Sequence, residues 1–175
     1  IQPSMRLLAT SLEQLKKSNI ILYNCSFLSI DSIDAIVETL VLNLAGVGVG
    51  YSVENSSICN LPQIIKKDTS DYIQFEVSDS AEGWIESIRI LLTQLYLGDN
   101  VKFDYSLIRP AGQPLKTKGG YSSGYQILEH VHNEFRNIFL NCKTEQLSSL
   151  EVHDLITILA DAGLSGGIRR SSLIC

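Results

Sequence analysis

The chain has 175 residues, of which 45% are hydrophobic and 19% are charged, and these values suit one globular domain with a sizeable core. Its formal net charge is -5, which argues against a nucleic-acid partner because such proteins present a basic face to the phosphates. No apolar run reaches the roughly 18 residues of a membrane span, and the N-terminal residues lack the long apolar core of a signal peptide. We therefore expect a cytoplasmic protein without a membrane partner.

The two ends of the sequence indicate a fragment, and the spacing of its cysteines indicates that they do not bind a metal. The sequence starts at Ile1 without Met and stops at Cys175 inside the apolar run SSLIC, so we expect a fragment of a longer protein. The other cysteines, Cys25, Cys59 and Cys142, are widely spaced and form no CxxC pair. This spacing argues against a zinc site, and we expect no metal ligands in this chain.

The first half of the chain alternates apolar runs with turn residues. Residues 20–25 form a short apolar run that predicts a buried strand. Asp31 or Ser32 is a suitable cap for a helix whose apolar positions repeat every 3.6 residues as far as Gly46. The stretch GVGVGYSVE that follows favours a strand, and the polar residues 55–71 are predicted to leave the core.

The second half begins with YIQFEV, residues 72–77, whose alternation predicts a strand. Asp79 or Ser80 then caps a helix that Gly98 closes, and we expect this helix to pack on the 32–45 helix and to bury Trp84. Residues 104–124 form a long irregular segment rich in Gly, Pro, Ser and Lys, and such segments are usually functional or disordered.

Two more helices and a strand complete the pattern. The first helix is expected at residues 126–141, and the second runs from the capping box Ser148–Glu151 to Gly163. Residues 165–174 read as a glycine turn that enters a further strand. The order of the elements is typical of an α/β protein.

Three motifs need weighing before any function is inferred. Gly46, Gly48 and Gly50 lie after a helix and before a strand, the reverse of a dinucleotide-binding loop, so they indicate tight backbone passage instead. His130 and His132 point about 200° apart on a helix and cannot share a metal ion. Basic residues beside glycines, at 116–118 and 169–170, are either solvated or an anion site; both interpretations remain open.

Several stretches together resemble one enzyme family. They include YNCSF at 23–27, RPAGQPLKTKGG at 109–120 and GGIRRSSLI at 166–174, and they run in order along nearly the whole chain. With QPSMR, GVGVGYSVE, DSAEGW and EVHDL they are similar to the adenosylcobalamin-dependent ribonucleotide reductases, especially the monomeric ribonucleoside-triphosphate reductase type.

The resemblance implies a fold and a reaction. The fold would be the first half of a ten-stranded α/β barrel, with residues 55–103 as an inserted segment that carries an effector-site helix. The full-length enzyme would use adenosylcobalamin, bound mainly outside this chain, to reduce ribonucleoside triphosphates by a thiyl-radical route. Its partners would be a deoxynucleotide effector and a thioredoxin-like reductant, and it would be a monomer; this fragment alone would be inactive.

The resemblance also assigns roles to residues. Cys25 matches one half of the reducing cysteine pair, whose partner would lie downstream, whereas without the resemblance it would be interpreted as a buried structural cysteine. The other three cysteines match no catalytic one. Substrate-binding residues would be Ser4, Asn24 and Ser26. Effector and specificity residues would be Val53, Glu54, Asp79, Ser80, Lys116, Gly166, Gly167, Arg169, Arg170 and Ser171.

Two other functions remain open from the sequence. A non-catalytic nucleotide-binding module could use GGIRRS and LKTKGG as an anion cradle, and a redox-silent Cys25 would favour it. An anaerobic glycyl-radical-type reductase would share the barrel, although the RPAG and GGIRRS stretches favour the cobalamin branch.

Overall fold

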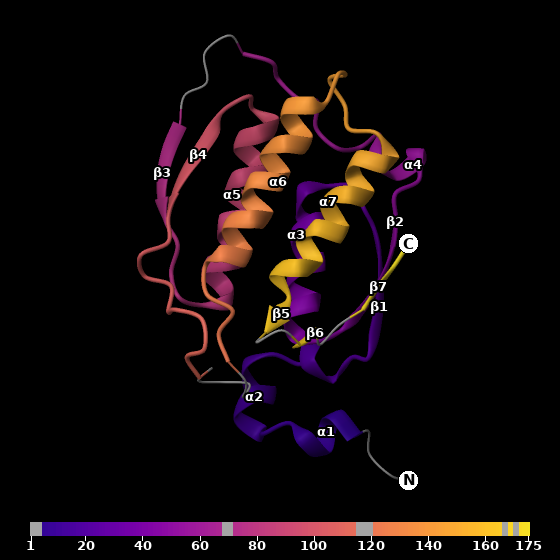
Figure 1. Ribbon diagram of the computed structural model, residues 1–175. Helices are drawn as coiled ribbons and strands as arrows, with labels where there is room; N and C mark the ends of the chain where they lie inside the picture. The colour runs from indigo at the N-terminus through magenta and orange to yellow at the C-terminus, as the bar shows by residue number, and fades with distance from the viewer. Residues whose placement is uncertain (1–4, 68–71, 115–120, 166–167, 170–171) are drawn as a thin grey trace.

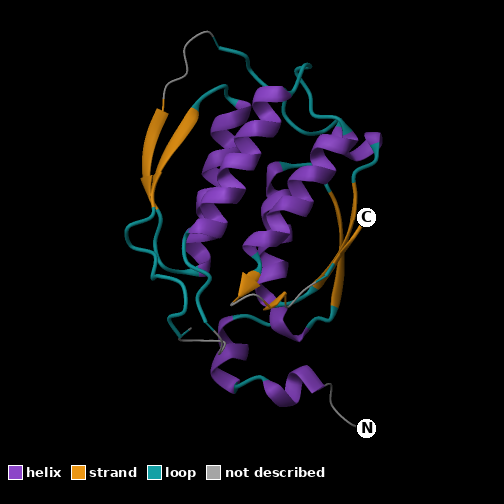
Figure 2. Ribbon diagram, in the orientation of Figure 1, coloured by secondary structure: helices purple, strands orange, loops and turns teal. Residues whose placement is uncertain are grey.

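The computed structural model describes residues 5–67, 72–114, 121–165, 168–169 and 172–175. A layer of long helices occupies the middle of the molecule, with a small sheet on either side of it (Figures 1 and 2). The α/β class predicted from the sequence is therefore confirmed. The helical layer consists of α3 (Ile33–Ala45), α5 (Ala81–Tyr96), α6 (Gln126–Asn141) and α7 (Ser149–Ala162).

Each of the two main sheets is built on a β-α-β unit. On one side, parallel strands pair in the order β1-β2-β7, with Cys25 opposite Gly48 and Val49 opposite Leu173. On the other side, β3 and β4 form a parallel pair that is connected through α5, as parallel neighbours require a crossover. The strands are β1 (Cys25–Ser29), β2 (Gly48–Ser52), β3 (Tyr72–Glu76), β4 (Asn100–Asp104), β5 (Leu164–Ser165), β6 (Ile168–Arg169) and β7 (Leu173–Ile174).

The described strands are too few to test the barrel that the resemblance implies. Within the described residues there is one three-stranded parallel sheet, the β3–β4 pair and a short antiparallel pair of β5 with β6. A ten-stranded barrel therefore stays a proposal about the full-length protein.

The strand expected at residues 20–25 is wrong in position. Ile20–Leu22 forms a 3-10 turn (η1), in which the Tyr23 N–H donates to the carbonyl of Ile20 at 3.0 Å. The strand begins only at Cys25, where side chains start to alternate between exposed and half-buried. A short apolar run has no periodicity that separates a strand from a helical turn, which explains the error. Two short helices precede η1, namely α1 (Met5–Ala9) and α2 (Leu12–Lys17).

The predicted helix ends are confirmed at atomic detail. Ser32 and Ser80 each accept a hydrogen bond from the backbone N–H three residues later, at 3.2 and 3.0 Å. Gly46 follows α3 with φ 82°, a left-handed conformation that favours glycine. Ser148 and Glu151 form the reciprocal capping box at the start of α7.

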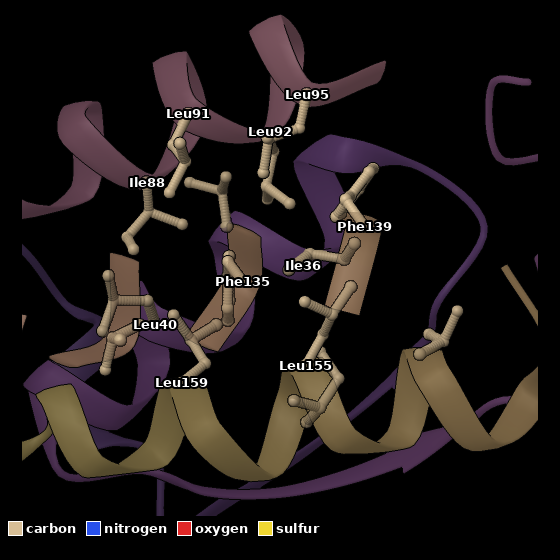
Figure 3. Close-up of a cluster of buried hydrophobic side chains, with 14 of the residues drawn as sticks. Ile36, Leu40, Ile88, Leu91, Leu92, Leu95, Phe135, Phe139, Leu155 and Leu159 are labelled. Carbon is tan, nitrogen blue, oxygen red and sulfur yellow. The ribbon is translucent and has the colours of Figure 1, made fainter. Parts of the chain in front are cut away.

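The core lies where the four long helices meet (Figure 3). Ile36 and Leu40 of α3, Ile88 of α5, Phe135 of α6 and Leu155 of α7 all have no exposed surface. Each such side chain contributes about 1.5–3 kcal/mol by leaving water, so this cluster is the main source of stability.

Residues 55–71 were predicted to leave the core, and this was wrong for three of their apolar members. Ile58, Leu61 and Ile64 are buried in the same cluster as the long helices. Ile58 ends the one-turn helix α4 (Asn55–Ile58), which packs against α7. The apolar residues recur at every third position, a spacing that indicates burial on one side of the chain. The sequence analysis overlooked this spacing because the residues between them are mostly polar.

The helix packing expected for residues 80–97 is confirmed, since α5 packs against α3. Trp84 contacts the main core but is only half-buried, so the expectation of a largely buried indole was too strong. Strand β4 was missed altogether, because its inward side chains, Val101 and Phe103, make an alternation too short to be recognised.

Candidate functional site

Cys25 is a free, exposed thiol at the first residue of β1. It shares one face of the β1-β2-β7 sheet with Phe27 and Ser29, because side chains alternate along a strand. Phe27 is 68% exposed, and Ile174 of β7 on the same face is 72% exposed. The opposite face packs on the helices, so Cys25 lies on the open face of this sheet.

Two glycines shape the open face. A Cβ atom on Gly50 would lie 3.3 Å from Cδ2 of Phe27, and one on Gly48 would lie 3.1 Å from Oγ of Ser172. Both distances are tighter than ordinary side-chain contacts, so glycine lets neighbouring strands place their side chains over β2. The interpretation of these glycines as sites of close passage agrees with this geometry.

The residues that flank Cys25 have different surroundings. The carbonyl of exposed Asn24 accepts a hydrogen bond from the Gly48 N–H at 2.9 Å, which fixes the start of β1. Ser26 points to the helix side of the sheet, where its buried Oγ has no hydrogen-bond partner. Of the predicted substrate residues, Ser26 therefore does not share the face of Cys25, and Ser4 lies outside the described residues.

Predicted effector residues gather at the N-terminus of α5. Asp79 accepts a hydrogen bond from Nε of Arg109 through Oδ2 at 2.7 Å, and Ser80 caps the helix. The Ser80 hydroxyl also lies 2.9 Å from the hydroxyl of Ser78. Both predicted residues thus already have partners within the chain, and Arg109 was not singled out by the sequence analysis.

The other predicted effector residues are not brought to that end. Val53 and Glu54 directly precede α4, and Figure 1 shows α4 and β5–β6 at opposite ends of the helical layer. The carbonyl of Val53 accepts a hydrogen bond from Ser149 Oγ at 2.7 Å, whereas the Glu54 side chain is exposed and caps no backbone group. Both residues thus lie at the start of α4, and Val53 contacts the start of α7.

Most of the predicted specificity loop cannot be placed. Arg169 ends β6, opposite Leu164 of β5. The remaining predicted residues of this group lie outside the described residues: Lys116, Gly166, Gly167, Arg170 and Ser171.

The sequence analysis missed a buried polar cluster around His132. Its Nε2 lies 3.1 Å from the Ser87 hydroxyl, and its Nδ1 lies 2.8 Å from the Tyr105 hydroxyl. The imidazole is stacked on the Phe103 ring at 4.0 Å and has no exposed surface. His130, two residues earlier, is exposed, so the expectation that the two histidines share no site is confirmed.

The hydrogen-bond partners define the tautomer of His132. Ser87 donates its single hydroxyl hydrogen to the carbonyl of Trp84 at 2.8 Å, so its oxygen must accept from Nε2–H. Nδ1 then carries no hydrogen and accepts from Tyr105. Burial, and then the charge of Arg136, lowers the pKa of His132 to about 3, which keeps the ring neutral. The cluster thereby ties α5, α6 and the start of the 105–114 segment together.

Two adjoining hollows of about 430 and 500 Å³ run along β4 and α6. They share Lys102, Phe103, Tyr105 and Glu129 as lining residues. Arg136 lines one of them: it lies over the Phe103 ring at 5.6 Å and donates to the Val101 carbonyl at 2.7 Å. Its guanidinium is therefore already engaged by the protein, which leaves Lys102 as the exposed cation that both hollows share.

Neither a metal site nor a membrane span is found in the described part of the chain. Among those residues, no three His, Cys, Asp or Glu side chains gather closely enough to hold a metal ion. None of the described helices combines the length and the apolar character needed to cross a bilayer.

Comparisons with known proteins converge on one family. No protein-family model matches the chain. A Dictyostelium discoideum protein named as a probable adenosylcobalamin-dependent ribonucleoside-triphosphate reductase is 34% identical over 172 residues, which cover 87% of this chain and 23% of that protein. The Euglena gracilis adenosylcobalamin-dependent ribonucleoside-triphosphate reductase is 33% identical over 159 residues, which cover 87% of this chain and 22% of that protein.

A solved structure extends the likeness to the fold. The crystal structure of a B12-dependent (class II) ribonucleotide reductase matches 98% of this chain and 31% of its own, with a TM-score of 0.80 at 21% identity. This structural match shows that the chain shares the fold of that region. Over the residues compared, the chain is similar to the adenosylcobalamin-dependent ribonucleoside-triphosphate reductases. It spans less than a quarter of the length of the two relatives named above.

Proposed function

We propose that the full-length protein reduces ribonucleoside triphosphates to 2′-deoxyribonucleotides with adenosylcobalamin, and that this chain supplies one of its redox thiols, Cys25. The similarity to curated reductases over 87% of the chain carries this proposal. The exposure of Cys25 on the open face of the β1-β2-β7 sheet supports it, because a redox thiol must reach both a substrate and an external reductant.

The chemistry of the proposed role balances with two thiols. Replacing the 2′-hydroxyl by hydrogen takes two electrons and two protons; the hydroxyl leaves as water, and two cysteines become one disulfide. In this proposal Cys25 supplies one thiol, and a cysteine in a downstream part of the full-length protein supplies the other, as the resemblance implies. A thioredoxin-like dithiol reduces the disulfide and readies the enzyme for another turnover.

Adenosylcobalamin is assigned to other parts of the full-length protein. The resemblance implies that adenosylcobalamin is bound mainly by regions outside this chain. We therefore assign no residue of this chain to the cofactor.

A deoxynucleotide effector is the second ligand that we propose, with its site near the N-terminus of α5. Asp79 and Ser80 lie there, and Arg109 links Asp79 to the carbonyl of Pro114. In this proposal the 55–103 insertion supplies α5 in cis, so that the enzyme works as a monomer. The packing of α5 on α3 supports this arrangement.

The test uses the full-length protein with a ribonucleoside triphosphate, adenosylcobalamin and a dithiol reductant. Wild-type protein should form deoxynucleotide over many turnovers, and Cys25→Ser should stop after less than one turnover per active site. Cys59→Ser is the matched control, because Cys59 is also free and exposed but lies at the end of α4, far along the chain from β1. Sustained turnover by Cys25→Ser would remove the redox role of Cys25, whereas an absence of turnover by the wild-type protein would favour a non-catalytic nucleotide-binding module instead.

A further inference from the structure

The 108–114 and 121–124 segments form a stem that the sequence did not reveal. Pro114 and Tyr121 make an antiparallel bridge, and the Ser122 N–H donates to the Gln113 carbonyl at 2.7 Å. The Gly112 N–H donates in return to the Ser122 carbonyl at 2.9 Å. Gly112 has φ 84°, a left-handed backbone conformation that favours glycine. The two flanks of the LKTKGG segment are therefore held side by side.

Arg109 connects this stem to the start of α5. Its Nε donates to Asp79 Oδ2 at 2.7 Å, and its Nη1 donates to the Pro114 carbonyl at 3.0 Å. The carbonyl of Arg109 accepts from the Ser122 hydroxyl at 3.4 Å, which joins the second flank to the same residue. The Arg109 side chain is only 19% exposed, and that of Asp79 is 33% exposed. The Arg109 side chain thus joins the residue before α5 to the first flank of the stem, and the Arg109 backbone carbonyl contacts the second flank.

The pairing changes the interpretation of Asp79. With one carboxylate oxygen engaged by Arg109, the pair carries no net charge, so it neither attracts nor repels the phosphates of a nucleotide strongly. Asp79 acts here as the anchor for a guanidinium rather than as a direct ligand. The planar fork of arginine can meet a carboxylate and a carbonyl at the same time, which a lysine ammonium cannot do with the same geometry.

We propose that Arg109 is a positioning residue for effector-dependent substrate choice: it holds the 108–114/121–124 stem at the N-terminus of α5 in the arrangement that the effector recognises. The inference rests on the proposed effector site. An effector changes substrate preference only by binding one arrangement of the enzyme more tightly than another. A stem that is free to leave α5 lowers that difference, so the effector response weakens even though the substrate site is untouched.

The experiment compares Arg109→Ala, Arg109→Lys and the control Lys67→Ala in the full-length protein. Lys67 also forms an ion pair, with Asp99 at 2.6 Å, but it does so beside the C-terminal end of α5. For each variant, the four ribonucleotides compete as substrates while each deoxynucleotide is titrated, and the thermal midpoint is measured without ligand. We expect Arg109→Ala to raise the effector concentration for a half-maximal shift about tenfold, within the usual range of coupling. Arg109→Lys should fall between it and wild type, and Lys67→Ala should match wild type.

The outcomes separate this inference from the proposed function. If wild-type protein shows no change of substrate preference with any deoxynucleotide, the proposed effector site is wrong. If wild type responds and Arg109→Ala responds at the same concentrations, Arg109 is not a positioning residue. If Arg109→Ala and Arg109→Lys lose the response only in proportion to a lowered thermal midpoint, the residue is merely structural and the inference fails.

Discussion

Acidification should destabilise the protein through His132 well before its carboxylates are protonated. In the folded protein the pKa of His132 is lowered to about 3, whereas in the unfolded chain it returns to about 6.5. Between these values the unfolded state binds the proton and the folded state does not. The stability that the neutral imidazole contributes is therefore complete above pH 6.5 and is lost as the pH falls toward 3.

The size of the effect follows from the two pKa values. Proton binding by the unfolded chain alone lowers the free energy of unfolding by about 2 kcal/mol at pH 5 and about 3 kcal/mol at pH 4. A loss of this size is a large part of the stability of an ordinary domain. The structural cause is that protonated Nδ1 could no longer accept from Tyr105, and its charge would lie buried near Arg136.

Urea unfolding of wild type, His132→Gln and His130→Gln between pH 7.5 and 4 measures this effect. His132→Gln should be less stable at pH 7 by about 1–3 kcal/mol, because Tyr105 loses its acceptor, but its curve should be flatter between pH 6.5 and 4. His130→Gln should follow wild type, since His130 is exposed on the same helix. Parallel curves for wild type and His132→Gln over this interval would refute the assignment of a buried, neutral imidazole.

Three further changes test the fold. Gly98→Ala should cost at least about 2 kcal/mol, because Gly98 has φ 76° and the added Cβ would lie 2.2 Å from the Ile65 carbonyl oxygen; a thermal midpoint equal to wild type would contradict this. Ser148→Ala should lower the free energy of urea unfolding by about 1 kcal/mol through loss of the capping box, whereas the exposed neighbour Leu150→Ala should change it little. Phe135→Ala should cost about 3–5 kcal/mol by opening a cavity among the four long helices, and a loss under 1 kcal/mol would mean that the core is packed otherwise.

Local signals predicted the helices well, because their causes are local. Ser32, Ser80 and Ser148 cap helices through bonds to residues three positions away, so the sequence alone contains both partners. Gly46 ends α3 for an equally local reason, its left-handed backbone. Elements whose formation depends on distant partners were harder to predict. Residues 100–104 form the strand β4 because they pair with β3, whereas the apolar residues 20–22 form the 3-10 turn η1 instead of a strand.

Sequence motifs indicated single positions of the candidate site, but they did not indicate which residues contact one another there. The residues alone favoured a buried structural cysteine at the end of a strand, and this was wrong, because Cys25 is exposed and begins β1. The resemblance assigned Cys25 a redox role, which stays a prediction. The partners of Asp79 and His132 lie 30 or more positions away in the chain, or on another element, and no spacing rule connects them. Val53 and Glu54 were grouped with Asp79 by resemblance, yet the fold separates them along the helical layer.

The contact between Phe27 and Gly50 on the open sheet face sets a condition on how this region can evolve. The phenyl ring already occupies the space into which any side chain at position 50 would grow, at 3.3 Å from its Cβ. The two positions therefore share one volume, and neither can enlarge alone without displacing the other. Across related sequences, a residue larger than glycine at position 50 should appear together with a smaller residue at position 27, as a correlated exchange rather than as two independent changes.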